Sequence, residues 1–401
     1  MADVRPFRAL RPHDAVAHRV IAPPYDVLSE AQARAIAENR HSFVRITRPE
    51  VDLPEGTDAH SDTAYAQART TLNAFVADGI VVRDAVPTYY FYGQQMGEHS
   101  QVGVIAGASV AEYDDGRIAK HEYTRPDKED DRTHHMAVLG AQVGLVFLTH
   151  RPTAALAQIT AEVTQRPPAW STTTEDGVVH TLWLSPPELV EPIRAAFGEV
   201  ERLYIADGHH RSAAASRIHA QRGDDASAHF LAGLYPSDRL HVMAYNRVVH
   251  DLAGHDGPAA FLAAVRAAGF DVEPTAAPTP SERGKLTMYL AGRWYALRPG
   301  EALRSDDPVA GLDVSVLQDH VLAPLLGIDD PRRSTRISFV GGIHGHAALA
   351  EAVDAGAAVA FHLYPTGLDQ LFDVADAGRV MPPKSTWFEP KLREGVLIRS
   401  L

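Results

Sequence analysis

The spacing of hydrophobic side chains in the first part of the chain is typical of amphipathic helices. Ala68, Leu72 and Phe75 are four and three positions apart, so they fall on one face of a helix. We therefore predict a helix over residues 61–78. A second helix is expected to begin at residues 29–32, where a serine and a glutamine have the spacing of a capping box.

Apolar segments bounded by turn residues predict strands elsewhere. Residues 88–96 and 101–113 are rich in β-branched and aromatic side chains, and the short polar segment between them indicates a hairpin. Residues 171–184 are expected to form a second hairpin that turns at an Asp-Gly pair. Residues 42–50 are also predicted to form a strand. Further strands are expected at residues 3–10, 143–150, 202–207, 229–236, 240–251, 285–290, 293–299, 336–341 and 357–365.

The order of these elements predicts an α/β or α+β fold with mixed sheets, because helices and strands alternate along the chain. The 401 residues suffice for two or three domains of roughly 100–200 residues each. Residues 271–284 contain three prolines and few apolar side chains, as linkers do. We predict a first domain of residues 1–250 and a smaller C-terminal α/β domain of residues 251–401, whose tail packs back on the first.

Composition narrows the classes of protein to consider. The chain has no cysteine, which excludes disulfides and cysteine-ligated metal sites. Its net charge of −13 contrasts with the basic excess of nucleic-acid binders, so we expect no nucleic-acid partner. The first residues lack the apolar stretch of a signal peptide, and no apolar run approaches the ~18 residues of a membrane span. We therefore expect a cytoplasmic protein without a membrane partner.

The strongest candidate for chemistry is the segment Asp207-Gly208-His209-His210-Arg211. It follows an apolar strand and begins a predicted helix, whose N-terminal N–H groups attract anions. Gly208 allows the backbone to approach an anion closely, Arg211 can bind a phosphate with two parallel hydrogen bonds, and the histidines add donors. The alternative is that Asp207 merely caps the helix and the histidines lie on the surface. We interpret the segment as a phosphate-binding turn.

The second candidate is the charged segment of residues 121–132. Pro126 suits the first turn of a helix, and carboxylates on this helix could hold Mg²⁺, which takes one or two carboxylates together with phosphate oxygens. The basic side chains could neutralise a transferred phosphate. The alternative is a solvated helix start with salt bridges. The candidate site residues are Glu122 as a catalytic carboxylate, Asp127 and Asp130 as metal ligands, and Arg125, Lys128 and Arg132 as phosphate contacts.

Two further residues are weaker candidates. Asp26 follows a proline-stiffened loop and could take a proton from a substrate hydroxyl, although an aspartate before a helix is often only a cap. Lys384 lies in the C-terminal tail beside a serine and a threonine and could contact phosphate, although the tail could simply pack across a core. The chain has no GxxxxGK[ST], HExxH, GxSxG or GxGxxG motif, which argues against P-loop enzymes, zinc proteases, hydrolases and dehydrogenases of the common kinds.

Two resemblances extend these observations. The string IADGHHRSAAA resembles the core motif of the ParB-like superfamily, which includes the free-serine kinases and a CTP-binding partition protein. Among these proteins, the kinases share the sequence Asp-Gly-His-His-Arg most closely. The strings RPFRALRP, IAPPYDVLS, SFVRITRPE, HEYTRPDKEDDR, NRVV and MPPKSTWFEPK resemble the family called domain of unknown function 1015 over nearly the whole chain. The second family implies no settled activity.

The superfamily resemblance implies that residues 1–250 form a ParB-like or serine-kinase-like nucleotide-binding core elaborated by hairpins. It implies phosphate contacts from Gly208 to Arg211 and a catalytic or metal-side role for Asp207. The expected function is a small-molecule phosphotransferase that uses Mg²⁺ with ATP or ADP and phosphorylates a small hydroxyl-bearing metabolite such as serine. Alternatives are a nucleotide-binding regulator without phosphotransfer and a phosphoester hydrolase. A homodimer is a possible assembly.

Overall fold

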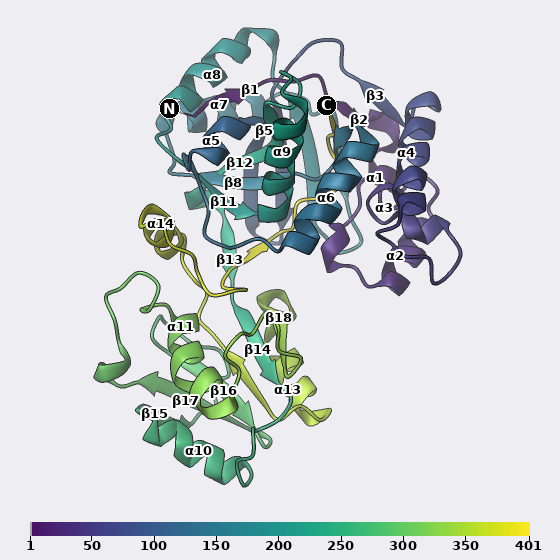
Figure 1. Ribbon diagram of the computed structural model, residues 1–401. Helices are drawn as coiled ribbons and strands as arrows, with labels where there is room; N and C mark the ends of the chain where they lie inside the picture. Colours follow the sequence, from purple (N-terminus) through teal and green to yellow (C-terminus); the bar gives the residue numbers. More distant parts are fainter. Residues whose placement is uncertain (1) are drawn as a thin grey trace. The chain divides into compact units, whose positions relative to one another are not determined.

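The computed structural model describes residues 2–401 and divides the chain into two compact units (Figure 1). The first unit consists of Met1–Leu240 and Pro390–Leu401, and the second consists of His241–Glu389. The division therefore falls at 240/241, compared with the sequence-based boundary at 250/251. The C-terminal segment belongs to the first unit because its backbone pairs with the N-terminal part of the chain, as Ile398 does with Leu10.

Among residues 2–401, the first unit is built on a nine-stranded mixed sheet in the order β6-β11-β8-β12-β5-β4-β10-β9, with β1 paired to β5. The pairs β6–β11 and β8–β12 are parallel, and the other pairs of this sheet are antiparallel. Two small pairs, β2–β3 and β7–β21, lie apart from it. The strands are β1 Val4–Arg5, β2 Leu10–Pro12, β3 Val81–Arg83, β4 Tyr90–Met96, β5 His99–Ser109, β6 Ile118–Ala119, β7 Ala141–Gln142, β8 Val146–His150, β9 Trp170–Thr173, β10 Val179–Leu184, β11 Leu203–Asp207, β12 His229–Pro236 and β21 Arg399–Ser400.

Helices pack against this sheet. Among them, α9 and α6 lie side by side (Figure 1). Small buried residues, Ala213, Ala214 and Ala215, let α9 lie close to its neighbours. The helices are α1 Ala17–Val20, α2 Glu30–Ala37, α3 Val44–Thr47, α4 Asp62–Ala77, α5 Val110–Asp114, α6 Pro126–Leu139, α7 Ala154–Thr164, α8 Val190–Gly198 and α9 His209–Arg222, with 3-10 turns at η1 Asp14–Val16, η2 Tyr25–Val27, η3 Pro49–Asp52, η4 Pro187–Leu189 and η5 Ser237–Arg239.

The helix starts follow the local signals in the sequence. Ser29 accepts a hydrogen bond from the Gln32 N–H at 3.3 Å, and the Gln32 side chain accepts one from the Ser29 N–H at 2.9 Å, so the capping box of α2 is complete. The Ser61 hydroxyl caps α4 through the Ala64 N–H. Gly223 ends α9 in the left-handed conformation that favours glycine.

The expected strand over residues 42–50 is wrong. This segment forms α3 and η3, and the Arg48 N–H donates to the Val44 carbonyl as in a helix. Val44 and Ile46 are β-branched, but both are buried in a cluster formed by helices and by residues of β2, β3 and β7, and none of the strands described pairs with this segment. Packing therefore overrides the local preference for a strand.

The second unit contains a six-stranded antiparallel sheet in the order β15-β17-β16-β19-β14-β18, and β13 pairs with β20. The expected strand over 240–251 is interrupted between β13 and β14. Among residues 2–401, no helix combines the length and the apolar character that crossing a membrane requires. The elements are β13 His241–Met243, β14 Tyr245–Val249, β15 Phe270–Pro274, β16 Leu286–Leu290, β17 Arg293–Pro299, β18 Ile337–Gly341, β19 Val359–His362, β20 Trp387–Glu389, α10 Pro258–Ala267, α11 Asp313–Leu317, the π-helical η7 Gln318–Leu322, α12 Ala323–Leu326, α13 Gly345–Asp354, α14 Leu368–Asp376, and the 3-10 turns η6 Glu301–Leu303 and η8 Gly342–His344.

Gly103 on β5 tests the packing of the large sheet. A Cβ atom at this position would lie 2.4 Å from the Tyr235 ring on β12, so we expect Gly103→Ala to lower the free energy of unfolding by about 1–3 kcal/mol. Urea denaturation measures this change. Gly198→Ala is the matched control, because a Cβ there meets no atom within 4 Å. Equal stabilities of the two variants would contradict the packing described for Tyr235.

Candidate functional site

The turn at Gly208 joins strand β11 directly to helix α9. Gly208 has φ 98°, a value that favours glycine, and a Cβ would lie 3.3 Å from the Val146 Cα. No side chain of the described residues caps the helix. The 14-residue α9 therefore presents its N-terminal end, with the positive end of its dipole, at a turn where the backbone can approach a ligand.

Asp207 lies at the end of β11 and stays ionised. Burial acts to raise its pKa, but the charges of Lys391 and Arg211 and the hydrogen bond from the Gly208 N–H lower it to about 2. The Gly208 N–H donates to Oδ1 at 2.8 Å, and the Lys391 Nζ is 3.9 Å from Oδ2. The side chain is 41% exposed, so this carboxylate remains accessible to a ligand.

Arg211 lies in the first turn of α9 and points inward. Its Nη1 donates to the Leu145 carbonyl, and a Cβ on Gly144 would lie 3.0 Å from its Cδ. Within residues 2–401, no carboxylate oxygen lies within 4.0 Å of its guanidinium. Burial acts to lower the pKa of Arg211, but the negative charges of Asp207, Asp26 and others outweigh it and raise the pKa. Arg211 is a charged group without a direct ionic partner.

A small pocket brings Arg211 together with Arg132 of α6. Its volume is about 30 Å³, enough for one water molecule. Arg132 lines it and is fixed by an ion pair to Asp131 at 2.5 Å and by stacking 4.3 Å over the Tyr25 ring. Two guanidinium groups from the two predicted motifs thus share one pocket. The pocket is lined by Tyr25, Thr47, Arg132, His135, Met136, Ala141, Val143, Gly144, Arg211 and Glu394.

Glu394 is the acidic residue of this pocket. It is 4% exposed, and its Oε2 has no hydrogen-bond partner among the described residues. Burial raises the pKa of Glu394 to about 7, although the Thr47 hydroxyl and the Arg211 charge act to lower it. Asp26, on η2, is exposed, but its charge also acts on Glu394 and Arg211. A carboxyl group that titrates near neutral pH beside two arginines can accept or donate a proton.

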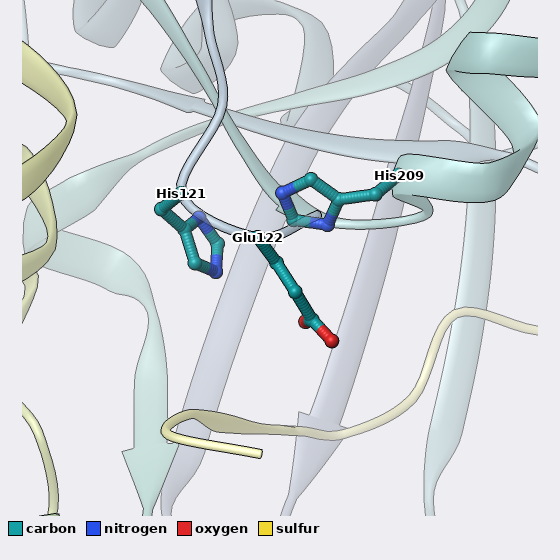
Figure 2. A group of neighbouring side chains, drawn as sticks. All are labelled: His121, Glu122 and His209. Carbon is teal, nitrogen blue, oxygen red and sulfur yellow. The ribbon is translucent and has the colours of Figure 1, made fainter. Parts of the chain in front are cut away.

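A second group of side chains includes His209 of the same turn. His121 and His209 are 3% and 6% exposed, and their rings meet edge to face with centroids 4.6 Å apart. One ligand atom from each of His121, Glu122 and His209 lies within 4.8 Å of the others. Figure 2 shows the two imidazoles approaching each other from the loop and from the start of α9, with Glu122 extending below them. These three residues could hold a metal ion.

The remaining residues predicted on α6 lie at the surface. The exposed Arg125 and Asp127 pair with each other at 2.8 Å, and Asp130 pairs with Arg217 of α9 at 2.7 Å. Lys128 is exposed. The backbone N–H of Arg125 donates to the His210 Nε2 at 3.1 Å, which ties the start of α6 to the turn.

The C-terminal tail supplies residues that sequence reasoning missed. Lys384, the predicted phosphate contact, belongs to the second unit, where its Nζ is 5.5 Å from the centre of the Tyr245 ring. Lys391 and Glu394 belong to the first unit and approach Asp207 and Arg211. Lys391 is the last residue of the string MPPKSTWFEPK, so the family resemblance already pointed to its segment. No sequence motif includes Glu394.

The chain belongs to the family described as protein of unknown function (DUF1015), which matches residues 4–315. No curated protein matches the sequence. Similar solved structures include a free serine kinase in complex with AMP, with 13% identity, 71% of this chain and 86% of that chain covered, and a TM-score of 0.37. Another is SbnI with a C-terminal truncation from Staphylococcus aureus, with 10% identity, coverages of 72% and 84%, and a TM-score of 0.40. A third is a conserved hypothetical protein from Pyrococcus furiosus, with 12% identity, coverages of 71% and 90%, and a TM-score of 0.36.

The raised pKa of Glu394 predicts a pH dependence of stability. The folded chain holds this proton more tightly than the unfolded chain, so the stabilisation is complete below pH ~4.5 and is lost as pH rises through about 7. Relative to Glu394→Gln, the wild type should therefore lose about 3 kcal/mol between pH 5 and pH 8. Urea denaturation across this range measures the difference.

The exposed Glu55 provides the control, and Glu55→Gln should follow the wild type at every pH. Parallel curves for the wild type and Glu394→Gln would show that Glu394 has an ordinary pKa.

Proposed function

We propose that the first unit binds a nucleotide through its phosphates at the Gly208–Arg211 turn and transfers a phosphoryl group to a small hydroxyl-bearing metabolite. The observation that carries this proposal is the position of Arg211. Its guanidinium has no carboxylate within 4.0 Å among the described residues and lines one pocket with Arg132 and Glu394. The motif resemblance to the free-serine kinases of the ParB-like superfamily supports the same reading.

The N-terminus of α9 would bind the phosphates. Gly208 allows close approach of the backbone, the helix dipole favours negative charge, and Arg211 and Arg132 would stabilise the charge that develops during transfer. The pocket has room for one water molecule, about 30 Å³, so the nucleotide would lie outside it, against the N-terminus of α9.

Asp207 is the carboxylate that best fits a nucleotide-bound Mg²⁺. It is ionised, 41% exposed and next to the turn, whereas Asp127 and Asp130 are already paired with arginines at the surface. Mg²⁺ takes one or two carboxylates and completes its shell with phosphate oxygens and water. When bound, the ion would neutralise charge on the transferred phosphate.

Glu394 would take the proton from the acceptor hydroxyl. Its pKa of about 7 lies near the operating pH that general bases need, and it lines the pocket with both arginines. Asp26 is the second candidate, because its charge acts on the same two residues, Arg211 and Glu394. Glu122 lies with the paired histidines, which favours a role as a ligand over a role as the base.

Substitution of Arg211 tests the phosphate site. Loss of a charge-assisted hydrogen bond should weaken ATP binding about 10- to 100-fold in Arg211→Ala, and Arg211→Lys should retain part of the affinity. Isothermal titration with Mg²⁺–ATP measures both. The control is Arg222→Ala at the other end of α9, where the arginine pairs with Asp224 at the surface.

Unchanged ATP binding in Arg211→Ala would disprove the site. ATP or CTP binding without turnover, across a panel of hydroxyl-bearing metabolites, would point to a nucleotide-binding regulator. Release of free phosphate without an acceptor would identify a phosphoester hydrolase.

Substitution of Glu394 tests the base. Glu394→Gln should lower kcat by about 10²- to 10⁴-fold while leaving the Kd for ATP nearly unchanged. In the wild type, kcat should rise with pH through about 7, because only the ionised carboxylate accepts a proton. If Asp26→Asn removes this pH dependence and Glu394→Gln does not, Asp26 is the base.

A further inference from the structure

His121 and His209 have buried ring nitrogens that the protein leaves unsatisfied. The Nδ1 of His121 and the Nε2 of His209 have no hydrogen-bond partner among residues 2–401, and both side chains are more than nine-tenths buried. A buried polar atom without a hydrogen-bond partner lowers the stability of the fold by about 1–3 kcal/mol. Such atoms are therefore rare, and they commonly bind a water molecule or an ion. The two imidazole rings that carry them meet edge to face, with their centroids 4.6 Å apart.

The hydrogen bonding of His121 leaves its Nδ1 available as an acceptor. Its ring hydrogen-bonds to the backbone of Ile205, and because Nδ1 has no partner, the nitrogen that donates is Nε2. In a neutral imidazole one ring nitrogen carries the proton and the other is an acceptor, so Nδ1 of His121 is the unprotonated nitrogen. A backbone carbonyl that fixes the tautomer in this way is typical of metal-binding histidines.

Glu122 completes a set of three ligands from two elements. Glu122 follows His121 in the loop before α6, and His209 is the first residue of α9. The three ligand atoms lie within 4.8 Å of one another. Zinc–ligand distances are about 2.0–2.2 Å, so ligands of one ion lie at most about 4.4 Å apart. The group needs only a small contraction to hold an ion.

We propose that His121, Glu122 and His209 form a binding site for a divalent transition-metal ion such as Zn²⁺. Two imidazoles and a carboxylate suit such ions, whereas Mg²⁺ prefers oxygen ligands alone. Three protein ligands leave at least one coordination position for water or an anion. This site goes beyond the proposed phosphotransfer, because it needs neither a nucleotide nor Arg211.

Metal titration of the full-length chain tests the site. After treatment with a chelator, the protein should bind one Zn²⁺ in isothermal titration without nucleotide, and Co²⁺ should give the visible absorption of a nitrogen- and oxygen-ligated ion. His121→Gln and His209→Gln should each weaken Zn²⁺ binding by about 100-fold or more, as loss of a ligand costs at least as much as loss of its supporting contacts. Glu122→Gln should weaken it as well.

The control is His219→Ala, which removes a histidine from the same helix that bonds to Ser227 instead. It should bind Zn²⁺ like the wild type. Thermal unfolding with and without Zn²⁺ shows whether each variant is folded, and only proteins with the intact site should gain stability from the ion. Zn²⁺ binding that is equal in the wild type and the folded His121→Gln and His209→Gln variants would overturn the proposal, as would a crystal structure grown with Zn²⁺ that shows only water between the rings.

Discussion

The reversal of the chain at Gly208 is the constraint on which the candidate site depends. Strand β11 passes directly into α9, and a φ of 98° with Val146 close by leaves room for glycine alone. The side chains around the turn have different partners. Asp207 lies near Lys391, the ring of His209 meets that of His121, and Arg211 lines the pocket. One short segment thus contributes to three local arrangements, and a side chain at Gly208 would disturb all of them.

The charges in the pocket explain why its ligand should be an anion. Arg132 is balanced by its ion pair with Asp131, but Arg211 has no such partner. Glu394 titrates near pH 7, so at neutral pH it cancels only part of the remaining positive charge. Burial of a guanidinium is costly, and Asp207 and Asp26 offset this cost without a direct ion pair to Arg211. A bound phosphate would add a direct ionic contact. The charges of Arg211 and Asp26 also act on the pKa of Glu394, so an anion bound at Arg211 would change the pKa of the proposed base.

The parts of the structure that could be predicted are those fixed by nearby residues. The capping box at residues 29–32 and the turn at Gly208 depend on residues within a few positions of each other, and both have the expected local form. Residues 42–50 fold as helices because distant elements surround them, which no local pattern records. Lys391 and Glu394 reach the site from the far end of the chain. Their roles depend on tertiary contacts between residues about half the sequence apart, so periodicity and motif spacing could not reveal them.

The two adjacent histidines of the turn show how one motif can serve ligands of opposite charge. His209 is buried and its ring meets that of His121, and its Nε2 has no hydrogen-bond partner among residues 2–401, so this nitrogen is available to the proposed cation. His210 is only partly buried and accepts the Arg125 N–H, which holds the start of α6 against the turn. Arg211 is the residue of the turn that would bind the phosphate. A metal ion at His209 would add positive charge beside the N-terminus of α9 and would strengthen phosphate binding there, so the two sites would reinforce each other although each can be occupied alone.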